Sequence, residues 1–270
     1  MYAPKQTFLS NQSFNPTDIA LFVDFDGTLV DFADTPEAVI VSNQINLLLE
    51  SLHLHLNGAF ALISGRTLDS LMALVDADIN MAGSHGAQWR YRNGARQSVS
   101  LPGSEFINIK ALLAEYGKAK GLLIEDKGNA LALHYRTAPE QQQSLDSFID
   151  NTLKLPQRKD IRIIRGNCVR EILLAGTDKG VAIARFMSQP PFYGRKPLFI
   201  GDDTTDEDGF AWVNAHKGIS IKVGEGVSCA VERFSNTGEV LAFLTMTIKQ
   251  LENSEERLDD TTQPGTGTHR

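Results

Sequence analysis

The strongest constraint on the fold is an alternation of short apolar runs with segments of helical periodicity. The apolar runs IALFVD (19–24), FALIS (60–64) and INMAG (79–83) have the length and composition of strands in a sheet that is covered on both faces. Between them, apolar residues recur at helical spacing over 36–56 and 66–75. Strands that alternate with helices in this way predict a parallel sheet with right-handed crossovers.

A different order of elements follows the third strand. The segment 89–99 carries Asn-Gly between alternating residues, which predicts a β-hairpin. Beyond it, a helix followed by two strands with a tight turn occurs twice in succession. The predicted helices cover 106–118 and 139–153, and the predicted strands cover 121–126, 130–136, 160–165 and 168–175. This repeat predicts a small α+β domain built on an antiparallel sheet.

The alternation of strands and helices resumes after residue 176. Helices are predicted over 178–187, 205–215 and 238–251, and strands over 197–203 and 218–224. The predicted fold class is therefore α/β, with a parallel-sheet core and an inserted α+β cap domain of doubled helix–strand–strand units. We assign residues 1–102 and 177–252 to the core, 103–176 to the cap, and the polar residues 253–270 to a disordered tail.

Polar residues that suit a phosphate site follow the strands of the predicted core. Asp24 and Asp26 close the first strand, Ser64 closes the second, and Asp202 closes the first strand after the insertion, while Lys179 begins a helix. In open parallel sheets, ligands bind at the carboxyl ends of the strands. Neighbouring carboxylates repel each other and lose hydration unless a cation or a reaction requires them. A carboxylate cluster without His or Cys prefers a hard cation, and Mg²⁺ fits best.

These residue types can support phosphoryl transfer. One carboxylate can attack phosphorus to give an aspartyl-phosphate, and a second one, two residues on, can protonate the leaving oxygen and later activate water. Thr28, Ser64, Lys179 and backbone amides can bind the phosphoryl oxygens. Each group alone also has an ordinary explanation, such as a turn, a helix cap or a solvated charge. Their occurrence together at strand ends and helix starts favours a site.

The segments DFDGTLV, SGR, DKG and GDDTTDE resemble the four motifs of the haloacid-dehalogenase superfamily of phosphatases. The resemblance implies a Rossmann-like core, a Mg²⁺ cofactor and an aspartate nucleophile. It implies that Asp24 is the nucleophile and that Asp26 is the general acid/base. The metal would be held by Asp24, the backbone carbonyl of Asp26 and Asp202, with Asp203 and Asp206 in support, and the phosphate would be bound by Ser64 and Lys179.

Polar residues in the predicted cap indicate how the phosphate ester could be selected. Glu125 and Lys127 lie near the turn of a cap hairpin, and strand alternation places them on the same side of the chain. Such a pair can hydrogen-bond sugar hydroxyls. For His134, Tyr135 and Arg136, sugar contact and a merely solvated strand surface are equally compatible with the sequence.

Together, the segments GSHG, EDKGNALALHYR and VREI closely resemble trehalose-6-phosphate phosphatases, and the likeness covers about residues 20–250. This family implies hydrolysis of trehalose 6-phosphate to trehalose and phosphate, the second step of trehalose synthesis. The chain departs from the family at Leu173-Leu174-Ala175, where a basic residue or proline commonly precedes the glycine. The residues expected at the substrate are Arg66, Gly83, His85, Gly86, Glu125, Lys127 and Glu171.

Net charge and cysteine content limit the partners and the location that we expect for the protein. The formal net charge of −7 argues against a nucleic-acid or anionic-membrane partner, and Cys168 and Cys229 are expected to be reduced thiols in a cytoplasmic protein. We expect a monomer with a functional link to a trehalose-phosphate synthase. Two alternatives stay open: a phosphatase for another sugar phosphate, and a non-catalytic sugar-phosphate sensor or synthase partner. The presence of every catalytic group disfavours the second alternative.

Overall fold

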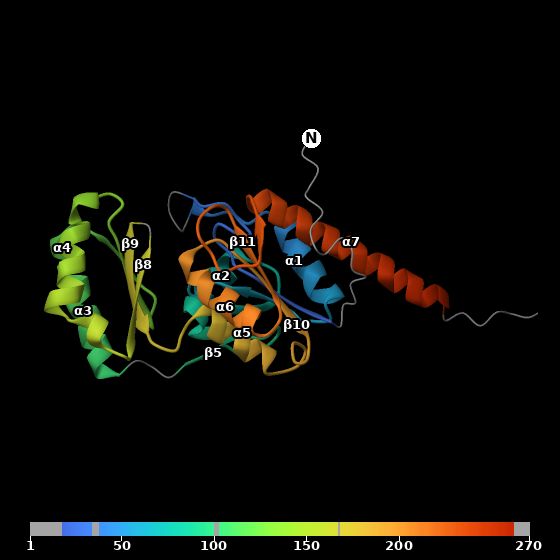
Figure 1. The fold of residues 1–270 in the computed structure, drawn as a ribbon, viewed down its shortest axis with the longest axis horizontal. Coiled ribbons are helices and arrows are strands. Elements are labelled where there is room, and N and C mark those ends of the chain that lie inside the picture. Colours follow the sequence, from blue (N-terminus) through green and yellow to red (C-terminus); the bar gives the residue numbers. More distant parts are fainter. Residues whose placement is uncertain (1–17, 34–37, 100–102, 167, 262–270) are drawn as a thin grey trace, which may run out of the picture.

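The computed structural model describes residues 18–33, 38–99, 103–166 and 168–261, which form two lobes (Figure 1). The larger one, the core lobe, contains an eight-stranded sheet in the order β12-β11-β10-β1-β2-β3-β4-β5. Its strands are β1 Ile19–Val23, β2 Phe60–Ile63, β3 Asn80–Gly83, β4 Gln88–Arg90, β5 Gln97–Ser98, β10 Lys196–Gly201, β11 Ile219–Val223 and β12 Glu232–Phe234. The first three and the last three strands pair in parallel, whereas β4 and β5 add the predicted antiparallel hairpin.

Helices cover both faces of this sheet, as the uniformly apolar strands require. On β1, Leu21 and Val23 join the core under α1 (Asn43–His55), α2 (Leu68–Leu74) and α7 (Thr237–Thr261). Ala20 and Phe22 point the other way, into the core under α5 (Lys179–Met187) and α6 (Glu207–Ala215). This doubly covered sheet confirms the predicted α/β class.

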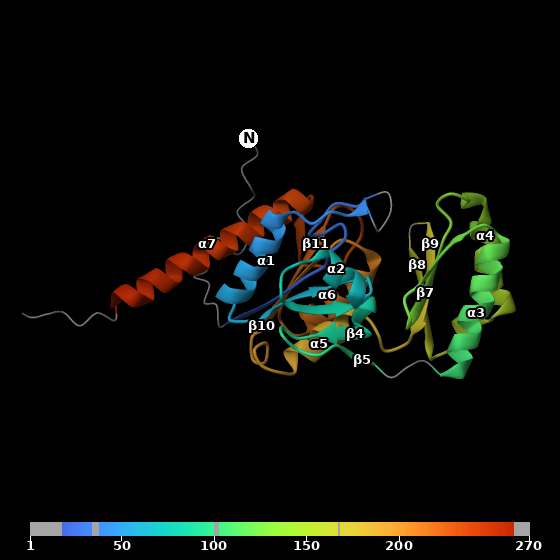
Figure 2. The ribbon, with the colours of Figure 1, turned by 180° about the vertical axis from the view of Figure 1, so that it is seen from behind.

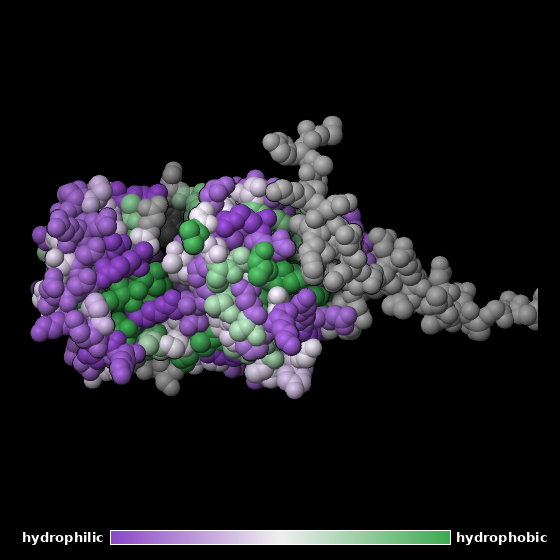
Figure 3. All heavy atoms as spheres, viewed as in Figure 1, coloured by the Kyte–Doolittle hydropathy of each residue, from purple (hydrophilic) through white to green (hydrophobic). Residues whose placement is uncertain are grey.

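The smaller one, the cap lobe, comprises residues 104–174. Its sheet has the order β6-β7-β9-β8 and is antiparallel throughout. The strands are β6 Leu123–Asp126, β7 Ala130–His134, β8 Ile161–Gly166 and β9 Val169–Leu174. Helices α3 (Ser104–Ala119) and α4 (Gln142–Ser147) pack on the face turned away from the core lobe (Figures 1 and 2). The outward surface of this lobe is mostly hydrophilic (Figure 3).

The predicted helix boundaries are wrong in two places. Helix α1 begins at Asn43 rather than near residue 36, because the Ser42 hydroxyl caps it by accepting from the Ile45 amide at 3.3 Å. The first part of that prediction, at 34–37, lies outside the described residues. Helix α7 continues to Thr261, so the predicted disordered tail is wrong for 253–261, where no glycine or proline interrupts the helix. The remainder, 262–270, also lies outside the described residues.

The sheet topology places one group of strand ends together. β1 lies between β10 and β2, and the chain leaves β1 to form β2 on one side and returns later to form β10 on the other. Such a switch point opens a crevice at the carboxyl ends of the two strands. The residues after β1 and β10 are Asp24 and Asp202. The cap lobe turns the open face of its sheet toward the core lobe (Figures 1 and 2).

Candidate active site

A buried lysine joins two aspartates at the centre of the site. Lys179 Nζ donates to Asp24 Oδ1 at 2.6 Å and to Asp206 Oδ1 at 2.7 Å. Lys179 is the first residue of α5, where the Asp178 side chain caps the helix by accepting from the Val181 amide at 2.8 Å. Three groups this deeply buried are tolerable only because opposite charges meet.

The third carboxylate of the cluster, Asp202, lies beside Asp24. The Thr28 hydroxyl lies 3.1 Å from Asp202 Oδ1 and 3.3 Å from Asp24 Oδ2, so it bridges the two side chains. Gly27 has a φ of +78°, and a Cβ there would lie 2.3 Å from the Asp202 carboxylate. The glycine of DFDGT is therefore required both for the turn and for the space that Asp202 occupies.

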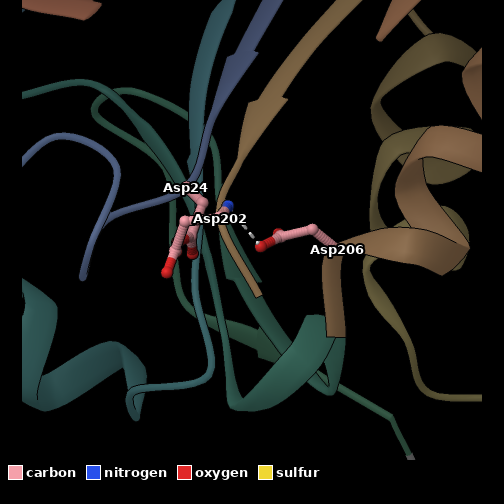
Figure 4. A group of neighbouring side chains, drawn as sticks. All are labelled: Asp24, Asp202 and Asp206. Atoms are coloured by element: carbon pink, nitrogen blue, oxygen red, sulfur yellow. Dashed lines mark hydrogen bonds between the residues drawn. The ribbon is translucent and has the colours of Figure 1, made fainter. Parts of the chain in front are cut away.

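Asp206 has a supporting position in this cluster. Its Oδ2 accepts from the backbone amides of Asp202 and Asp203, each at 2.9 Å, while its Oδ1 accepts from Lys179. Figure 4 shows Asp206 pointing at the backbone nitrogen of Asp202, whereas the carboxylates of Asp24 and Asp202 lie side by side. A Cβ on Gly201 would lie 2.3 Å from the Asp206 side chain, so this close approach also depends on a glycine.

The donor set fits a divalent cation. One oxygen each from Asp24, Asp202 and Asp206 lies within 4.8 Å of the others, and these ligands are hard oxygens without His or Cys. Asp206 accepts three hydrogen bonds, from Lys179 and two backbone amides, and is fully buried, so Asp24 and Asp202 keep more acceptor capacity for a metal. Three carboxylates and one ammonium leave two negative charges when all are ionised, which a divalent cation would neutralise.

The pKa values follow from this crowding. Burial raises the pKa of Asp24 well above its usual range, although Lys179 opposes the shift. Burial and the charge of Asp206 raise the pKa of Asp202 to about 6. Burial alone would lower the pKa of Lys179, but Asp206 and Asp24 outweigh it and raise that pKa above its usual value. At both carboxylates burial outweighs the charge of Lys179, and a bound cation would add the positive charge that lowers both pKa values.

Asp26 makes a separate ion pair. Arg66 Nε donates to Asp26 Oδ2 and Arg66 Nη2 to Asp26 Oδ1, both at 2.6 Å. Ser64 Oγ accepts from the Arg66 amide at 3.0 Å and is buried. Arg66, expected at the substrate, therefore holds the predicted general acid/base in one orientation.

The GSHG segment lies next to this pair and has an unusual backbone. Ser84 and His85 both have positive φ values, 49° and 52°, a region that residues other than glycine rarely occupy. Their amides donate to the carbonyls of Arg66 and Ser64 at 2.6 and 3.1 Å. A Cβ on Gly65 would lie 2.7 Å from the His85 ring, so the glycine of SGR leaves room for this ring.

From the cap lobe, Glu171 meets His85. His85 Nε2 lies 3.3 Å from Glu171 Oε2, and Lys127 Nζ donates to Glu171 Oε1 at 3.1 Å. Burial alone would raise the pKa of Glu171, but the charges and hydrogen bonds of His85 and Lys127 lower it to about 2. Glu171 and Lys127, two cap residues predicted to bind the sugar, thus form one hydrogen-bonded group with His85 of the core.

A second cap pair lies on the same sheet face. Glu125 and Glu171 both lie opposite Ala132 of β7, one on each side. His134 Nε2 lies 3.3 Å from Glu125 Oε2, and this hydrogen bond lowers the pKa of Glu125. Tyr135, by contrast, is buried in the cap, where its hydroxyl accepts from Arg170 at 2.6 Å. Tyr135 is therefore not part of a solvated strand surface but belongs to the cap interior.

A family model described as trehalose-phosphatase matches residues 22–239. The chain belongs to this family. The trehalose-6-phosphate phosphatase of Escherichia coli (strain K12) is 39% identical over 249 residues, which are 89% of this chain and 91% of that protein. A probable trehalose-phosphate phosphatase of Sinorhizobium fredii (strain NBRC 101917 / NGR234) is 42% identical over 224 residues, 82% of this chain and 84% of that protein.

A solved structure shares the fold of the present chain. The C-terminal domain of C. albicans trehalose-6-phosphate phosphatase matches with a TM-score of 0.74 at 20% identity, over 86% of this chain and 92% of that chain. The predicted family and the predicted class, a phosphoric monoester hydrolase, are confirmed. None of the described helices combines the length and apolarity that a bilayer crossing requires.

Two positions differ from what the sequence indicates. Asp203, expected to support the metal, is exposed and caps the short turn η7 (Thr204–Asp206), outside the group of three carboxylates. Lys222 of β11 was not expected at all, yet its buried Nζ donates to the Asp202 carbonyl and, at 3.2 Å, to that of Val223. The only sequence signal for it is a lysine inside the apolar run ISIKV.

Proposed function

We propose that this trehalose-phosphatase hydrolyses trehalose 6-phosphate to trehalose and inorganic phosphate through an aspartyl-phosphate on Asp24. The observation that carries the proposal is the buried Lys179, which reaches both Asp24 and Asp206 beneath a cap face that presents Glu171 and Lys127. We assign 1–102 and 177–252 to a catalytic core and 103–176 to a cap that selects the substrate. The family membership and the close relatives named above support the substrate.

The first chemical step forms the covalent intermediate. A carboxylate oxygen of Asp24 attacks phosphorus, and the bond from phosphorus to the sugar oxygen breaks. Asp26, as the carboxylic acid, gives its proton to the departing oxygen, so trehalose leaves as a neutral alcohol. Lys179, Ser64 and the backbone amides of this edge bind the phosphoryl oxygens, where charge accumulates.

The second step returns the enzyme to its starting state. Asp26, now a carboxylate, takes a proton from a water molecule, whose oxygen attacks phosphorus as the bond to Asp24 breaks. Arg66 keeps Asp26 in one orientation between the two steps through its two hydrogen bonds. Inorganic phosphate then leaves, and Asp24 is again ionised.

Mg²⁺ is the metal that we propose for this site. Asp24, Asp202 and the backbone carbonyl of Asp26 would hold it, with Asp206 and Lys222 positioning the segment that carries Asp202. When bound, it supplies positive charge that lets an anionic phosphate approach an anionic carboxylate. Its oxygen-only donors and the uncompensated charge of the cluster support this assignment.

The cap face would recognise the sugar. Trehalose is uncharged, so charged side chains bind it by hydrogen bonds to hydroxyls. Glu171, Lys127 and Glu125 form one row of such groups, and Gly83, His85 and Gly86 supply the facing wall of the core. A single copy of the chain carries all of these groups, so the proposed site needs no second subunit. The low cysteine content, Cys168 and Cys229 in 270 residues, supports a cytoplasmic location.

Phosphate release from a panel of sugar phosphates tests the proposal. We expect phosphate to be released fastest from trehalose 6-phosphate in the presence of Mg²⁺. Release should stop when EDTA removes the metal. Preference for another sugar phosphate would replace the substrate but keep the chemistry. If no sugar phosphate of the panel releases phosphate, the proposed enzymatic activity is wrong. A binding role would then remain, such as a sugar-phosphate sensor or a partner of the synthase.

A further inference from the structure

Besides Glu171 and His85, a second ionic contact connects the cap lobe to the core lobe. It starts at Arg162 on β8. In the sheet register, Arg162 lies opposite Leu173 and Ile164 lies opposite Glu171. Side chains two apart on a strand share a face, so Arg162 projects from the face that carries Glu171. This face is turned toward the core lobe.

Arg162 reaches the starts of two core helices. Its Nη2 donates to Asp208 Oδ2 in the first turn of α6, and its Nη1 lies 3.7 Å from Asp178 Oδ2, the N-cap of α5. About a third of the Arg162 and Asp208 side chains is exposed, so solvent weakens the contact without removing it. These helix starts directly adjoin Lys179 and Asp206.

The contact also bridges the linker that leads from the cap back to the core. The Ala175 amide donates to the Asp160 carbonyl at 2.9 Å, which ties that residue to the cap. Gly176 follows with a φ of +82° and open space around its α-carbon. Asp178, two residues later, already belongs to the core. Arg162 thus connects the two sides of a glycine at which the backbone can pivot.

We propose that Arg162 is a positioning residue: by pairing with Asp208 and Asp178 it fixes the cap at the distance from Asp24 that sugar-phosphate turnover needs. The inference rests on the proposed function. Substrate would compete for Glu171, whereas the Arg162 contact lies to one side of the sugar-binding row and persists during turnover. The expected effect is modest, since the pair is partly solvated.

The test compares Arg162→Gln, Asp208→Asn and the double variant with the wild-type protein. We expect each single variant to lower kcat/KM for trehalose 6-phosphate about threefold to tenfold, and the double variant to be no worse than either, because both remove the same contact. Hydrolysis of 4-nitrophenyl phosphate, which offers no sugar to the cap, should change less than about twofold. Amide hydrogen exchange over 175–177 should accelerate in each variant.

Arg165→Gln is the matched control. Arg165 lies on the same strand but pairs with Asp146 and Asp150 inside the cap. Equal losses in this control, effects that multiply in the double variant, or an equal loss on 4-nitrophenyl phosphate would overturn the inference and leave Arg162 as a local stabiliser. If the wild-type protein releases no phosphate from trehalose 6-phosphate, the proposed function fails, and the exchange measurement alone decides for or against the pivot.

Discussion

The charged side chains of the core and those of the cap are held by different kinds of partner. In the core, Lys179 and Asp206 are 2% and 0% exposed, and backbone amides fix Asp206. In the cap, the side chains of Glu171 and Glu125 are 8% and 37% exposed, and both pair with other side chains: Glu171 with His85 and Lys127, Glu125 with His134 and Lys127. The core groups are held rigidly for one reaction, whereas the cap groups are paired with one another until sugar hydroxyls replace those partners.

The largest expected effect is on Asp24. Asp24→Asn keeps the shape of the side chain but removes the nucleophile, so turnover should fall by about 10³-fold or more. Phosphate release at saturating substrate measures this loss. The unfolding midpoint without metal should not fall, because one of three crowded carboxylates is removed.

Asp203→Asn is the control for that variant. Asn caps a helix as well as Asp does, and Asp203 lies outside the carboxylate group. We expect it to retain activity within about tenfold of wild type, as befits loss of a nearby charge only. A loss as large as that of Asp24→Asn would show that Asp203 takes part in metal binding.

The second effect concerns the stability of the core. Lys179→Met leaves Asp24 and Asp206 buried without their cation, which should cost about 3–5 kcal/mol of unfolding free energy at pH 7. Lys110→Met, which breaks the pair with the exposed Asp126 of the cap, should cost less than about 1 kcal/mol. Urea denaturation without added metal measures both. Equal costs would mean that the two lobes hold their charges in the same way.

The proximity of the core residues can be predicted from the sequence because the relevant information is local. Asp24, Ser64 and Asp202 each follow an apolar run, and a parallel sheet necessarily brings such strand ends to one edge. The repeated helix–strand–strand unit of the cap is visible for the same reason. The start of α1 at Asn43 does not follow from the apolar pattern, because the apolar spacing extends before Ser42 without forming a helix.

Contacts that depend on strand register could not be predicted. Arg162 faces the core only because it lies opposite Leu173, and no turn or composition signal specifies that pairing. Arg66 and Asp26 come from separate strand ends, so their ion pair depends on side-chain directions that the sequence leaves open. In the sequence, Lys222 only interrupts an apolar strand. Its contact with the Asp202 carbonyl depends on the pairing of β11 with β10.

The third effect is a pH dependence that comes from Glu171. Its pKa is lowered to about 2, so the ionised carboxylate stabilises the folded protein above its ordinary pKa of about 4.5, and this contribution disappears as the pH falls toward 2. Glu171→Gln should therefore lower the unfolding free energy by about 3 kcal/mol at pH 7, and by progressively less below pH 4.5. Urea denaturation at several pH values measures the gap. A gap that does not change with pH would rule out this ionic origin.

The fourth effect should appear at Lys127, and only with the sugar substrate. Its ammonium pairs with Glu171 at 3.1 Å and lies 3.8 Å from Glu125, so Lys127→Ala disturbs the row of groups that we assign to the sugar without touching Asp24 or Lys179. We expect kcat/KM for trehalose 6-phosphate to fall about tenfold to 100-fold, the cost of one or two charged hydrogen bonds, while hydrolysis of 4-nitrophenyl phosphate stays within about twofold. The ratio of the two rates separates sugar recognition from chemistry. If the rates with both substrates fall equally, Lys127 supports the core reaction, and its assignment to sugar recognition is wrong.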